Sequence, residues 1–316
     1  MKTISQQEAD LIVAASNEGL TNFPPAALEK DILLTEVLHA IKSNNLYKPN
    51  LLQPVFGGGT SLIKGFSIIS RMSEDLDFKV ISQNQAPTDL NKKELGLLRD
   101  SIRATLEAQG FSIEDEDTKN SRRYFNFELG YKSSFDSVTS LRSNIQVEFT
   151  CSLLSVTPQL RKISTLLYRD TNISNPYDFE VLCVAPSQTA GEKIIGLLRN
   201  VKDIQAGSDD RLVRHIYDLH LLKESGLNTK TFSGAIFAAV EEDFARFKTA
   251  YPEDLVNNTV DYLRKSLEDL IGIENLDAIY QAFVTDLISG LPVPLETALR
   301  SLRQLVQHIE LDLHPE

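Results

Sequence analysis

Residues 57–78 read GGGTSLIKGFSIISRMSEDLDF, and this stretch decides how we interpret the rest of the chain. The apolar run over 51–56 predicts a short strand, which three glycines then interrupt. Residues 60–69 are compatible with one short helix, and acidic and apolar residues alternate over 75–81 as they do in a strand. The stretch therefore predicts the order strand, glycine turn, helix, strand.

The second of these strands carries two acidic residues. Asp75 and Asp77 are two positions apart, so both side chains point to one face of the strand, and Leu76 and Phe78 point to the other face and into a core. Neighbouring carboxylates repel each other unless a cation lies between them, and Mg²⁺ prefers such oxygen ligands. Taken alone, the pair could equally be two solvated residues on a strand face.

A third carboxylate strengthens the metal hypothesis. Glu148 lies in NIQVEF, which predicts another strand, between apolar neighbours. If this strand lies beside Asp75 and Asp77, three carboxylates meet. Such a set could hold two Mg²⁺ ions for a displacement reaction at the α-phosphate of a nucleoside triphosphate.

The glycine turn predicts an anion site next to this metal site. Glycines let a backbone approach a ligand closely, and the N-terminus of the following helix favours anions. Two hydroxyl groups follow the turn, and Arg71 and Ser73 could contact phosphates or simply shape the chain before the aspartates. The candidate nucleotide-binding residues of this stretch are Gly58, Gly59, Thr60, Ser61, Arg71 and Ser73.

The rest of the chain predicts an α+β protein with two domains. Apolar periodicity indicates helices over 24–43 and 89–109, and further strand patterns continue to residue 185. After Pro186 nearly all patterns are helical. We expect a mixed sheet flanked by helices in residues 1–185 and an all-helical domain in residues 186–316.

Composition points to an ordinary globular protein. The chain has 316 residues, of which 42% are hydrophobic and 24% charged, and no apolar run reaches membrane-spanning length. The first residues lack the apolar core of a secretory signal, so we expect a cytoplasmic protein with no membrane partner. Cys151 and Cys183 show no zinc-site spacing and are expected to be buried as small hydrophobic residues.

The net charge of −12 argues against broad, non-specific binding to nucleic acid. Residues 119–230 are nevertheless slightly basic, with 15 Lys and Arg against 12 Asp and Glu. This stretch could present a local basic surface, or its charges could be ordinary solvated ones. The basic residues in question are Arg122, Arg123, Arg161, Lys162 and Arg169.

Four motifs, in order and spacing, resemble those of the AbiEii/AbiGii toxin family, a branch of the DNA polymerase β-like nucleotidyltransferase superfamily. FGGGTSLIKG and SRMSEDLDF resemble its first motif, and LEKDILLTEVL at 28–38 resembles the helix before it. AGEKIIGLL at 190–198 and RHIYDLHLL at 214–222 resemble the third and fourth motifs. The similarity covers residues 25–225. The chain departs from the pattern in its triple glycine, in the long gap between Gly59 and Asp75, and in Glu148, where many relatives have aspartate.

This resemblance implies a role for each motif residue. Asp75 and Asp77 would bind Mg²⁺, and Glu148 would complete the metal site or help to deprotonate the acceptor. Lys193 would neutralise charge on the triphosphate, and Arg214 could reach a phosphate. Asp218 would orient Lys193 or the acceptor. The implied catalytic set is Asp75, Asp77, Glu148, Lys193 and Asp218. Alternatively, Lys193 is a surface lysine and Asp218 merely pairs with Arg214 one helical turn away.

The resemblance also implies a biological setting. Family members are toxins of toxin–antitoxin or phage-defence pairs, their usual partner is an AbiEi-like antitoxin, and some add nucleotides to the 3′ end of tRNA. Two alternatives stay open: a non-catalytic nucleotide- or partner-binding module, and transfer to a protein or small-molecule hydroxyl. A dinucleotide-binding turn is disfavoured because Leu62 replaces its third glycine, and a P-loop because Lys64 lacks the required neighbours.

Overall fold

The computed structural model describes most of the chain and divides it into two compact units. The first comprises Met1–Leu154 and Pro158–Val184, and the second comprises Ser155–Thr157 and Ala185–Glu316. The residues outside the description are 45–51, 83–89, 120–121, 137–140, 172, 208–209, 249–250, 252–254, 289–291 and 314–316.

The described part of the first unit is built on a seven-stranded sheet with the order β3-β4-β5-β2-β1-β7-β6. The sheet is mixed, because β2 pairs with β5, and β1 with β7, in parallel, whereas the other neighbours are antiparallel. The strands are β1 (Leu52–Gly57), β2 (Asp75–Ser82), β3 (Ser112–Lys119), β4 (Tyr124–Gly130), β5 (Asn144–Cys151), β6 (Gln159–Lys162) and β7 (Glu180–Cys183). The predicted mixed sheet flanked by helices is confirmed.

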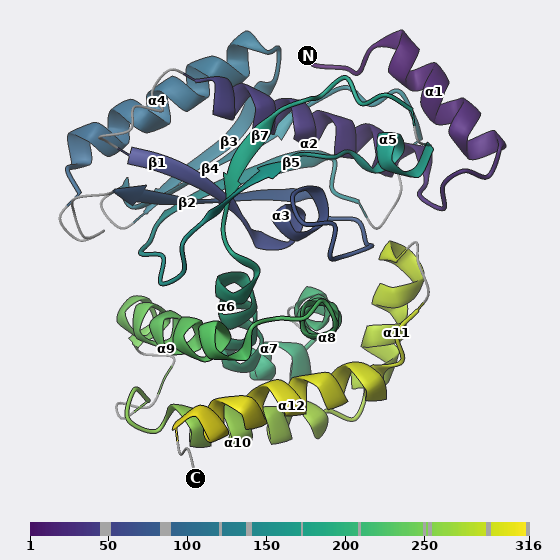
Figure 1. Ribbon diagram of the computed structural model, residues 1–316. Helices are drawn as coiled ribbons and strands as arrows, with labels where there is room; N and C mark the ends of the chain where they lie inside the picture. Colours follow the sequence, from purple (N-terminus) through teal and green to yellow (C-terminus); the bar gives the residue numbers. More distant parts are fainter. Residues whose placement is uncertain are drawn as a thin grey trace. The chain divides into compact units, whose positions relative to one another are not determined.

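One face of the central strands is apolar and forms the core of this unit. Phe149 on β5 stacks between Phe78 of β2 and Phe125 of β4, with ring centroids 4.9 and 4.7 Å apart. Helices α2 (Pro25–Ser43) and α4 (Lys92–Ala108) lie along the sheet (Figure 1). The alternation of buried and half-buried residues on β2, β4 and β5 leaves polar side chains on the opposite face.

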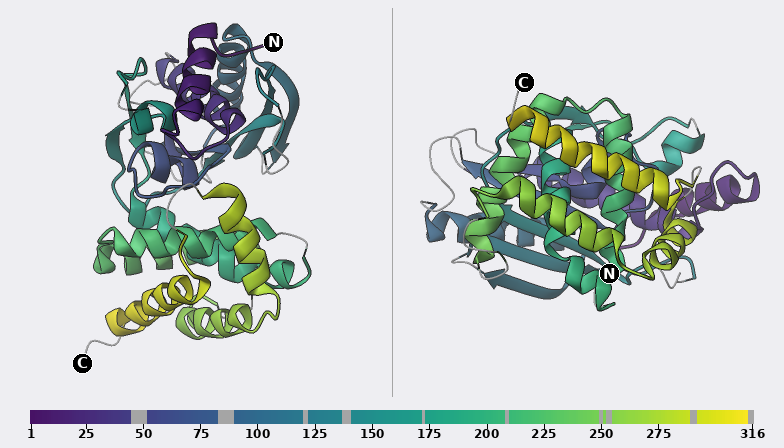
Figure 2. Two further views of the ribbon diagram at one scale, coloured as in Figure 1. Left: turned by 90° about the vertical axis from the view of Figure 1, so that its right-hand side faces the viewer. Right: turned by 90° about the horizontal axis from the view of Figure 1, so that it is seen from below.

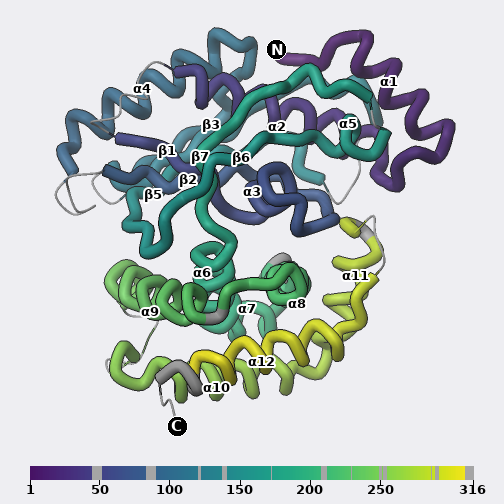
Figure 3. Tube along the Cα trace, in the orientation of Figure 1, coloured from purple at the N-terminus to yellow at the C-terminus, as the bar shows by residue number. Residues whose placement is uncertain are grey.

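The connection from β1 to β2 differs in detail from the sequence prediction. Helix α3 spans Gly58–Lys64, so it begins inside the glycine turn and ends five residues before position 69. The path from β1 through α3 to β2 can be followed in Figure 3. In the described part of the first unit, three elements were not predicted, namely α1 (Gln6–Asn17), β6 and α5 (Leu166–Thr171). The last two are short, and short elements carry too few residues for periodicity to show.

The second unit is helical, as predicted, and Figure 2 shows its helices from two further sides. Helix α6 packs against α8 and α9, and α12 packs against α8 and α10. A Cβ on Gly191 of α6 would lie 3.1 Å from the Ala235 backbone of α9, so glycine allows this close crossing. The helices are α6 (Pro186–Arg199), α7 (Val201–Gln205), α8 (Arg214–Glu224), α9 (Thr229–Arg246), α10 (Thr259–Ile271), α11 (Leu276–Leu287) and α12 (Leu295–Leu313).

Both cysteines are buried, as predicted. Burial raises the pKa of the Cys183 thiol to about 11, so this thiol stays protonated and unreactive near neutral pH. Among the described residues, no helix has the combination of length and apolar character that crossing a membrane requires.

Four of the five basic residues named from the sequence lie on or beside well-separated strands. Arg122 and Arg123 directly precede β4, whereas Arg161 and Lys162 lie on β6, and four strands of the sheet separate β4 from β6. Lys162 also pairs with Asp178, at 2.6 Å. Proximity in sequence did not translate into proximity in space because the chain crosses the sheet between these strands.

Candidate active site

The predicted carboxylates lie on neighbouring strands and on the same polar face of the sheet. Strands β2 and β5 are parallel neighbours, and Asp77 is the direct cross-strand partner of Glu148. Asp75 is likewise opposite Gln146. All four side chains are half-buried, whereas the residues between them are buried. Directly opposed positions on adjacent strands bring side chains within about 5 Å at the Cβ atoms, so Asp77 and Glu148 can share a ligand.

The carboxylates are nevertheless engaged with different partners. Asp75 Oδ1 accepts a hydrogen bond from Arg142 Nη1 at 3.0 Å. Glu148 accepts one from the hydroxyl of Tyr124 on β4. In the described part of the chain, no three acidic, histidine or cysteine side chains form a ready-made metal cluster. The strands thus bring the three acids together, while closer convergence needs side-chain rotation.

Burial raises the pKa of Glu148, and the negative charge of Asp75 raises it further. The Tyr124 hydrogen bond and the charges of Arg142 and Lys119 oppose this shift without cancelling it. Glu148 therefore takes up a proton more readily than an exposed glutamate does. A carboxylate with a raised pKa is a better proton acceptor than an exposed one.

We expect Glu148→Gln to raise the melting temperature of the first unit by a few degrees at neutral pH in the presence of EDTA. Below the unfolded pKa of 4.5 both states carry a protonated glutamate, so the variant gains nothing there. As pH rises above that value, ionisation favours the unfolded wild-type chain, and the advantage of glutamine grows until Glu148 ionises in the folded state.

Melting curves between pH 4 and pH 8 measure this difference, and Glu107→Gln on the exposed side of α4 is the matched control. A constant or reversed difference between Glu148→Gln and wild type across the pH range would contradict the raised pKa.

The glycine turn contacts the same strand. Gly58 has a φ of +68°, and a Cβ there would lie 1.9 Å from Asp77 Oδ2. Glycine is therefore needed both for the left-handed backbone and for the closeness of the turn to the carboxylate. The Thr60 hydroxyl lies 2.5 Å from the backbone oxygen of Asp75 and 2.9 Å from the Ser73 hydroxyl. These contacts fasten the turn to the start of β2.

The other candidate nucleotide-binding residues of this stretch are mostly interior. Thr60, Ser61 and Arg71 are all buried. Arg71 Nη1 donates to the backbone oxygen of Met72 at 2.7 Å, and its guanidinium lies close against Gly59. Gly58 and Ser73 are half-buried. These two, with the backbone of the turn, are the parts of the motif nearest to solvent.

We expect Gly58→Ala to destabilise the first unit by about 1–3 kcal/mol more than Gly19→Ala does. Gly19 has nearly the same φ, +67°, but a Cβ there meets nothing within 4 Å. Gly19→Ala is therefore destabilised by the strained backbone alone. The additional loss of stability in Gly58→Ala measures the clash with Asp77. Chemical denaturation of both variants gives the difference. Equal losses would mean that the turn does not press against the carboxylate.

Three consecutive charged residues on α2 are buried, and two of them pair with residues that flank the site. Glu29, Lys30 and Asp31 are each at most 2% exposed. Lys30 pairs with Glu74, directly before Asp75, at 2.7 Å, and Asp31 pairs with Lys64 of α3 at 2.6 Å. One turn of α2 thus holds both the start of β2 and the end of α3. The sequence carries a signal for this arrangement, namely three charges inside an otherwise apolar helix pattern.

The helical unit holds the remaining candidates. Lys193 of α6 and Asp218 of α8 form an ion pair of 2.9 Å, with side chains 8% and 0% exposed. His215 Nδ1 lies 3.4 Å from Lys193 Nζ. The alternative that Lys193 is a surface lysine is therefore wrong. Arg214, at the first position of α8, is half-buried.

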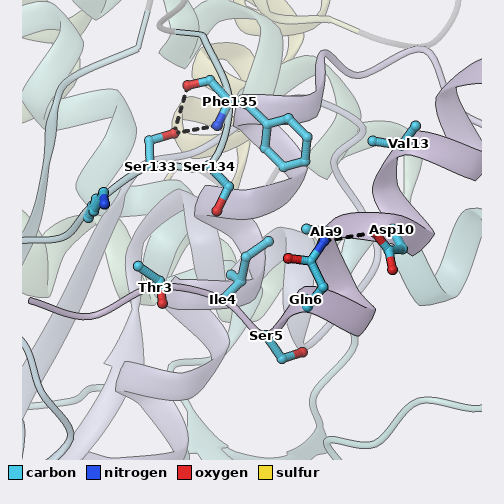
Figure 4. A pocket seen from close by; sticks show the side chains of 11 residues that line it. Thr3, Ile4, Ser5, Gln6, Ala9, Asp10, Val13, Ser133, Ser134 and Phe135 are labelled. Carbon is cyan, nitrogen blue, oxygen red and sulfur yellow. Dashed lines mark hydrogen bonds between the residues drawn. The ribbon is translucent and has the colours of Figure 1, made fainter.

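A pocket of about 480 Å³ lies elsewhere in the first unit (Figure 4). It is formed by the N-terminal part of α1 and the segment that follows β4, and it includes none of the candidate residues. Two of its residues, Ser133 and Ser134, donate hydrogen bonds to the buried Glu29 carboxylate. The full lining is Thr3, Ile4, Ser5, Gln6, Ala9, Asp10, Val13, Lys132, Ser133, Ser134 and Phe135.

The chemistry of the carboxylate site fits a divalent cation. Its potential ligands are carboxylate oxygens from Asp75, Asp77 and Glu148, which are the hard donors that Mg²⁺ prefers. Burial raises the pKa of Glu148, and the negative charge of Asp75 adds to this shift; a bound cation would relieve the repulsion between the two carboxylates. Asp77 also lies beside the glycine turn, where a backbone can approach a phosphate group.

The sequence model of the family described as "Nucleotidyl transferase AbiEii toxin, Type IV TA system" matches residues 37–307, which is most of the chain. The chain belongs to the AbiEii nucleotidyltransferase toxin family. It is thus an enzyme of the nucleotidyltransferase class and a toxin of a toxin–antitoxin system, and membership of the AbiEii family implies a cognate antitoxin as its partner.

Two further comparisons add little to the AbiEii assignment. The solved structure of MenT4, a nucleotidyltransferase toxin from Mycobacterium tuberculosis, is similar with a TM-score of 0.49 and 17% sequence identity, over 97% of this chain and 99% of that chain. A similarity of this size carries no weight beside the family match. No curated protein matched the chain.

Proposed function

We propose that this AbiEii family member transfers a nucleoside monophosphate from a nucleoside triphosphate to an acceptor hydroxyl in a Mg²⁺-dependent reaction, and that the acceptor is the 3′ end of tRNA. One observation supports the proposal above all others. Asp77 is paired directly with Glu148 across two parallel strands, and the Gly58 turn lies against Asp77. The arrangement combines carboxylate ligands for a cation with a close backbone turn for phosphate.

We assign Asp75 and Asp77 to metal binding, with Glu148 as the third ligand of a site for one or two Mg²⁺ ions. Bound there, Mg²⁺ would supply charge neutralisation at the phosphates and would lower the pKa of the acceptor hydroxyl. The acceptor oxygen forms a bond to the α-phosphorus, the bond to the bridging oxygen breaks, and pyrophosphate leaves with its electron pair. Glu148, whose pKa is raised, is our candidate to receive the hydroxyl proton when it is not acting as a ligand.

The triphosphate needs further positive and hydrogen-bonding groups. We assign this role to the turn residues Gly58 and Gly59, with Ser73 beside them, and to Lys193 and Arg214 in the helical unit. Lys193 Nζ lies 2.9 Å from a carboxylate oxygen of Asp218. Asp218 thereby holds the direction of the Lys193 side chain.

The wider setting belongs to the same proposal. The partner would be an AbiEi-like antitoxin, and removal of usable tRNA ends would stop translation, including during phage infection. Because tRNA is aminoacylated and used in the cytoplasm, the reaction would take place there.

The proposal is tested by incubating the purified full-length chain with Mg²⁺, each α-labelled nucleoside triphosphate in turn, and total tRNA. Label on the 3′ end of tRNA is the expected result, and its loss with EDTA is the matching control. Label on protein would instead support transfer to a protein hydroxyl. Nucleotide binding without transfer to any acceptor would support the non-catalytic alternative.

A further inference from the structure

Arg142 lies where it can act as a counter-cation for the first carboxylate of the site. Its guanidinium Nη1 is 3.0 Å from Asp75 Oδ1, and both side chains are 29% exposed. The same nitrogen donates to the side-chain oxygen of Gln146, the cross-strand partner of Asp75. No motif of the sequence drew attention to this arginine, which lies 67 positions after Asp75.

The backbone of Arg142 is held by two buried charged groups. Its N–H donates to Glu74 Oε2 at 2.6 Å, and its carbonyl oxygen accepts from Lys30 Nζ at 2.8 Å. Lys30 and Glu74 are themselves paired at 2.7 Å, and both are more than 90% buried. These three contacts close a ring that joins α2, the start of β2 and the start of β5.

The ring limits how Arg142 can respond to a ligand. Since Glu74 is the residue before Asp75, the ring fixes the backbone of the arginine relative to the carboxylate that it contacts. The guanidinium can leave Asp75 only by rotation of its side chain. An arginine is charged at all physiological pH values, so it remains a permanent positive charge at this position.

A positive group on Asp75 opposes a second cation at the same oxygen atoms. Like charges a few ångströms apart repel, and the repulsion is stronger in a half-buried site than in bulk water. In the described structure Asp75 is satisfied by Arg142, and Asp75 does not join Asp77 and Glu148 in a metal cluster.

We propose that Arg142 is a built-in competitor of the divalent cation for Asp75, and that it sets the metal concentration at which the carboxylate site assembles. The proposal rests on the proposed function, because it takes Asp75 to be a metal ligand. Arg142 is accordingly a positioning residue. Its guanidinium binds the Asp75 carboxylate while no metal is bound and releases this carboxylate when a cation binds.

Direct binding of Mn²⁺, followed by electron paramagnetic resonance on the full-length chain, tests the proposal without any measurement of activity. Arg142→Gln is expected to bind Mn²⁺ at least about fivefold more tightly than wild type, because the competing charge is gone. The control is Arg99→Gln, which removes an arginine of similar exposure that pairs with Asp100 at 2.7 Å on α4. It should leave the affinity unchanged.

Asp75→Asn separates failure of this inference from failure of the proposed function. If wild type binds no Mn²⁺ that depends on Asp75, the metal site itself is wrong. If wild type binds Mn²⁺ through Asp75 but Arg142→Gln binds it equally or less tightly, the competitor role is overturned. If Arg142→Gln binds the nucleotide more weakly but binds Mn²⁺ with unchanged affinity, the competitor role is likewise overturned. Arg142 would then be a phosphate ligand.

A second variant keeps the test decisive if Arg142→Gln does not fold. Gln146→Ala removes the other acceptor of the guanidinium, together with the hydrogen bond that Gln146 donates to Glu128. It leaves the ring of Lys30, Glu74 and the Arg142 backbone in place. It should loosen the hold on Asp75 and tighten Mn²⁺ binding by a smaller factor. Unchanged affinity in this variant would count against the proposal.

Discussion

Asp77→Asn is expected to reduce nucleotide transfer by at least about 10³-fold, equivalent to about 4 kcal/mol of transition-state stabilisation, while the fold remains intact. Asparagine keeps the shape of the side chain but loses the charge that a divalent cation requires. Asp77 is half-buried opposite Glu148, so removal of one negative charge also relieves repulsion in the unliganded protein.

The matched control is Asp100→Asn on α4, an aspartate that is 60% exposed. Transfer of labelled nucleotide and thermal unfolding are measured on both variants. We expect full activity in the control and an unchanged or higher melting temperature in Asp77→Asn. An inactive Asp77→Asn that is also unfolded would instead indicate a structural role for this aspartate.

Lys193→Met is expected to destabilise the helical unit by about 3–5 kcal/mol, because it leaves the fully buried Asp218 without its 2.9 Å partner. The double variant Lys193→Met/Asp218→Asn should recover much of this loss, since it removes both charges together. Urea unfolding, read by hydrogen exchange of the α6 and α8 amides, reports on this unit alone. Lys223→Met, at a half-exposed position of α8, is the control.

The outcome of this series changes how the phosphate role of Lys193 is tested. A single substitution of a buried, paired lysine affects folding before it affects a ligand. A loss of triphosphate use in the single variant therefore does not test the phosphate role. The double variant separates the two effects. If the double variant is stable and uses nucleoside triphosphates like wild type, the phosphate role of Lys193 is wrong. If Lys193→Met alone is as stable as wild type, the ion pair does not contribute to stability.

The sequence predicted the elements with long or strict patterns. The alternation around Asp75 and Asp77 predicted β2 and its polar face, and the periodicity over 24–43 predicted α2. The strand pattern of NIQVEF directed attention to Glu148, and the structure places its strand beside β2. Such patterns succeed because one buried face imposes a period of two or 3.6 residues.

The sequence did not predict the groups that hold the site together. Arg142 meets Asp75 from 67 positions away, and Lys30 meets Glu74 from 44 positions away. Such pairs depend on strand order and helix docking, which no local pattern encodes. Helix α3 began earlier than predicted because Gly58, with its positive φ, starts the helical turn instead of separating it from the strand.

The central claim is that the carboxylates on β2 and β5 support transfer of a nucleoside monophosphate. It is tested most directly by comparing α-labelled with γ-labelled nucleoside triphosphate in the presence of Mg²⁺ and total RNA, with wild type and Asp77→Asn side by side. The account predicts that wild type attaches α-label to the acceptor and releases γ-label as pyrophosphate, and that the variant does neither. Attachment of γ-label, or equal transfer by both proteins, would contradict it.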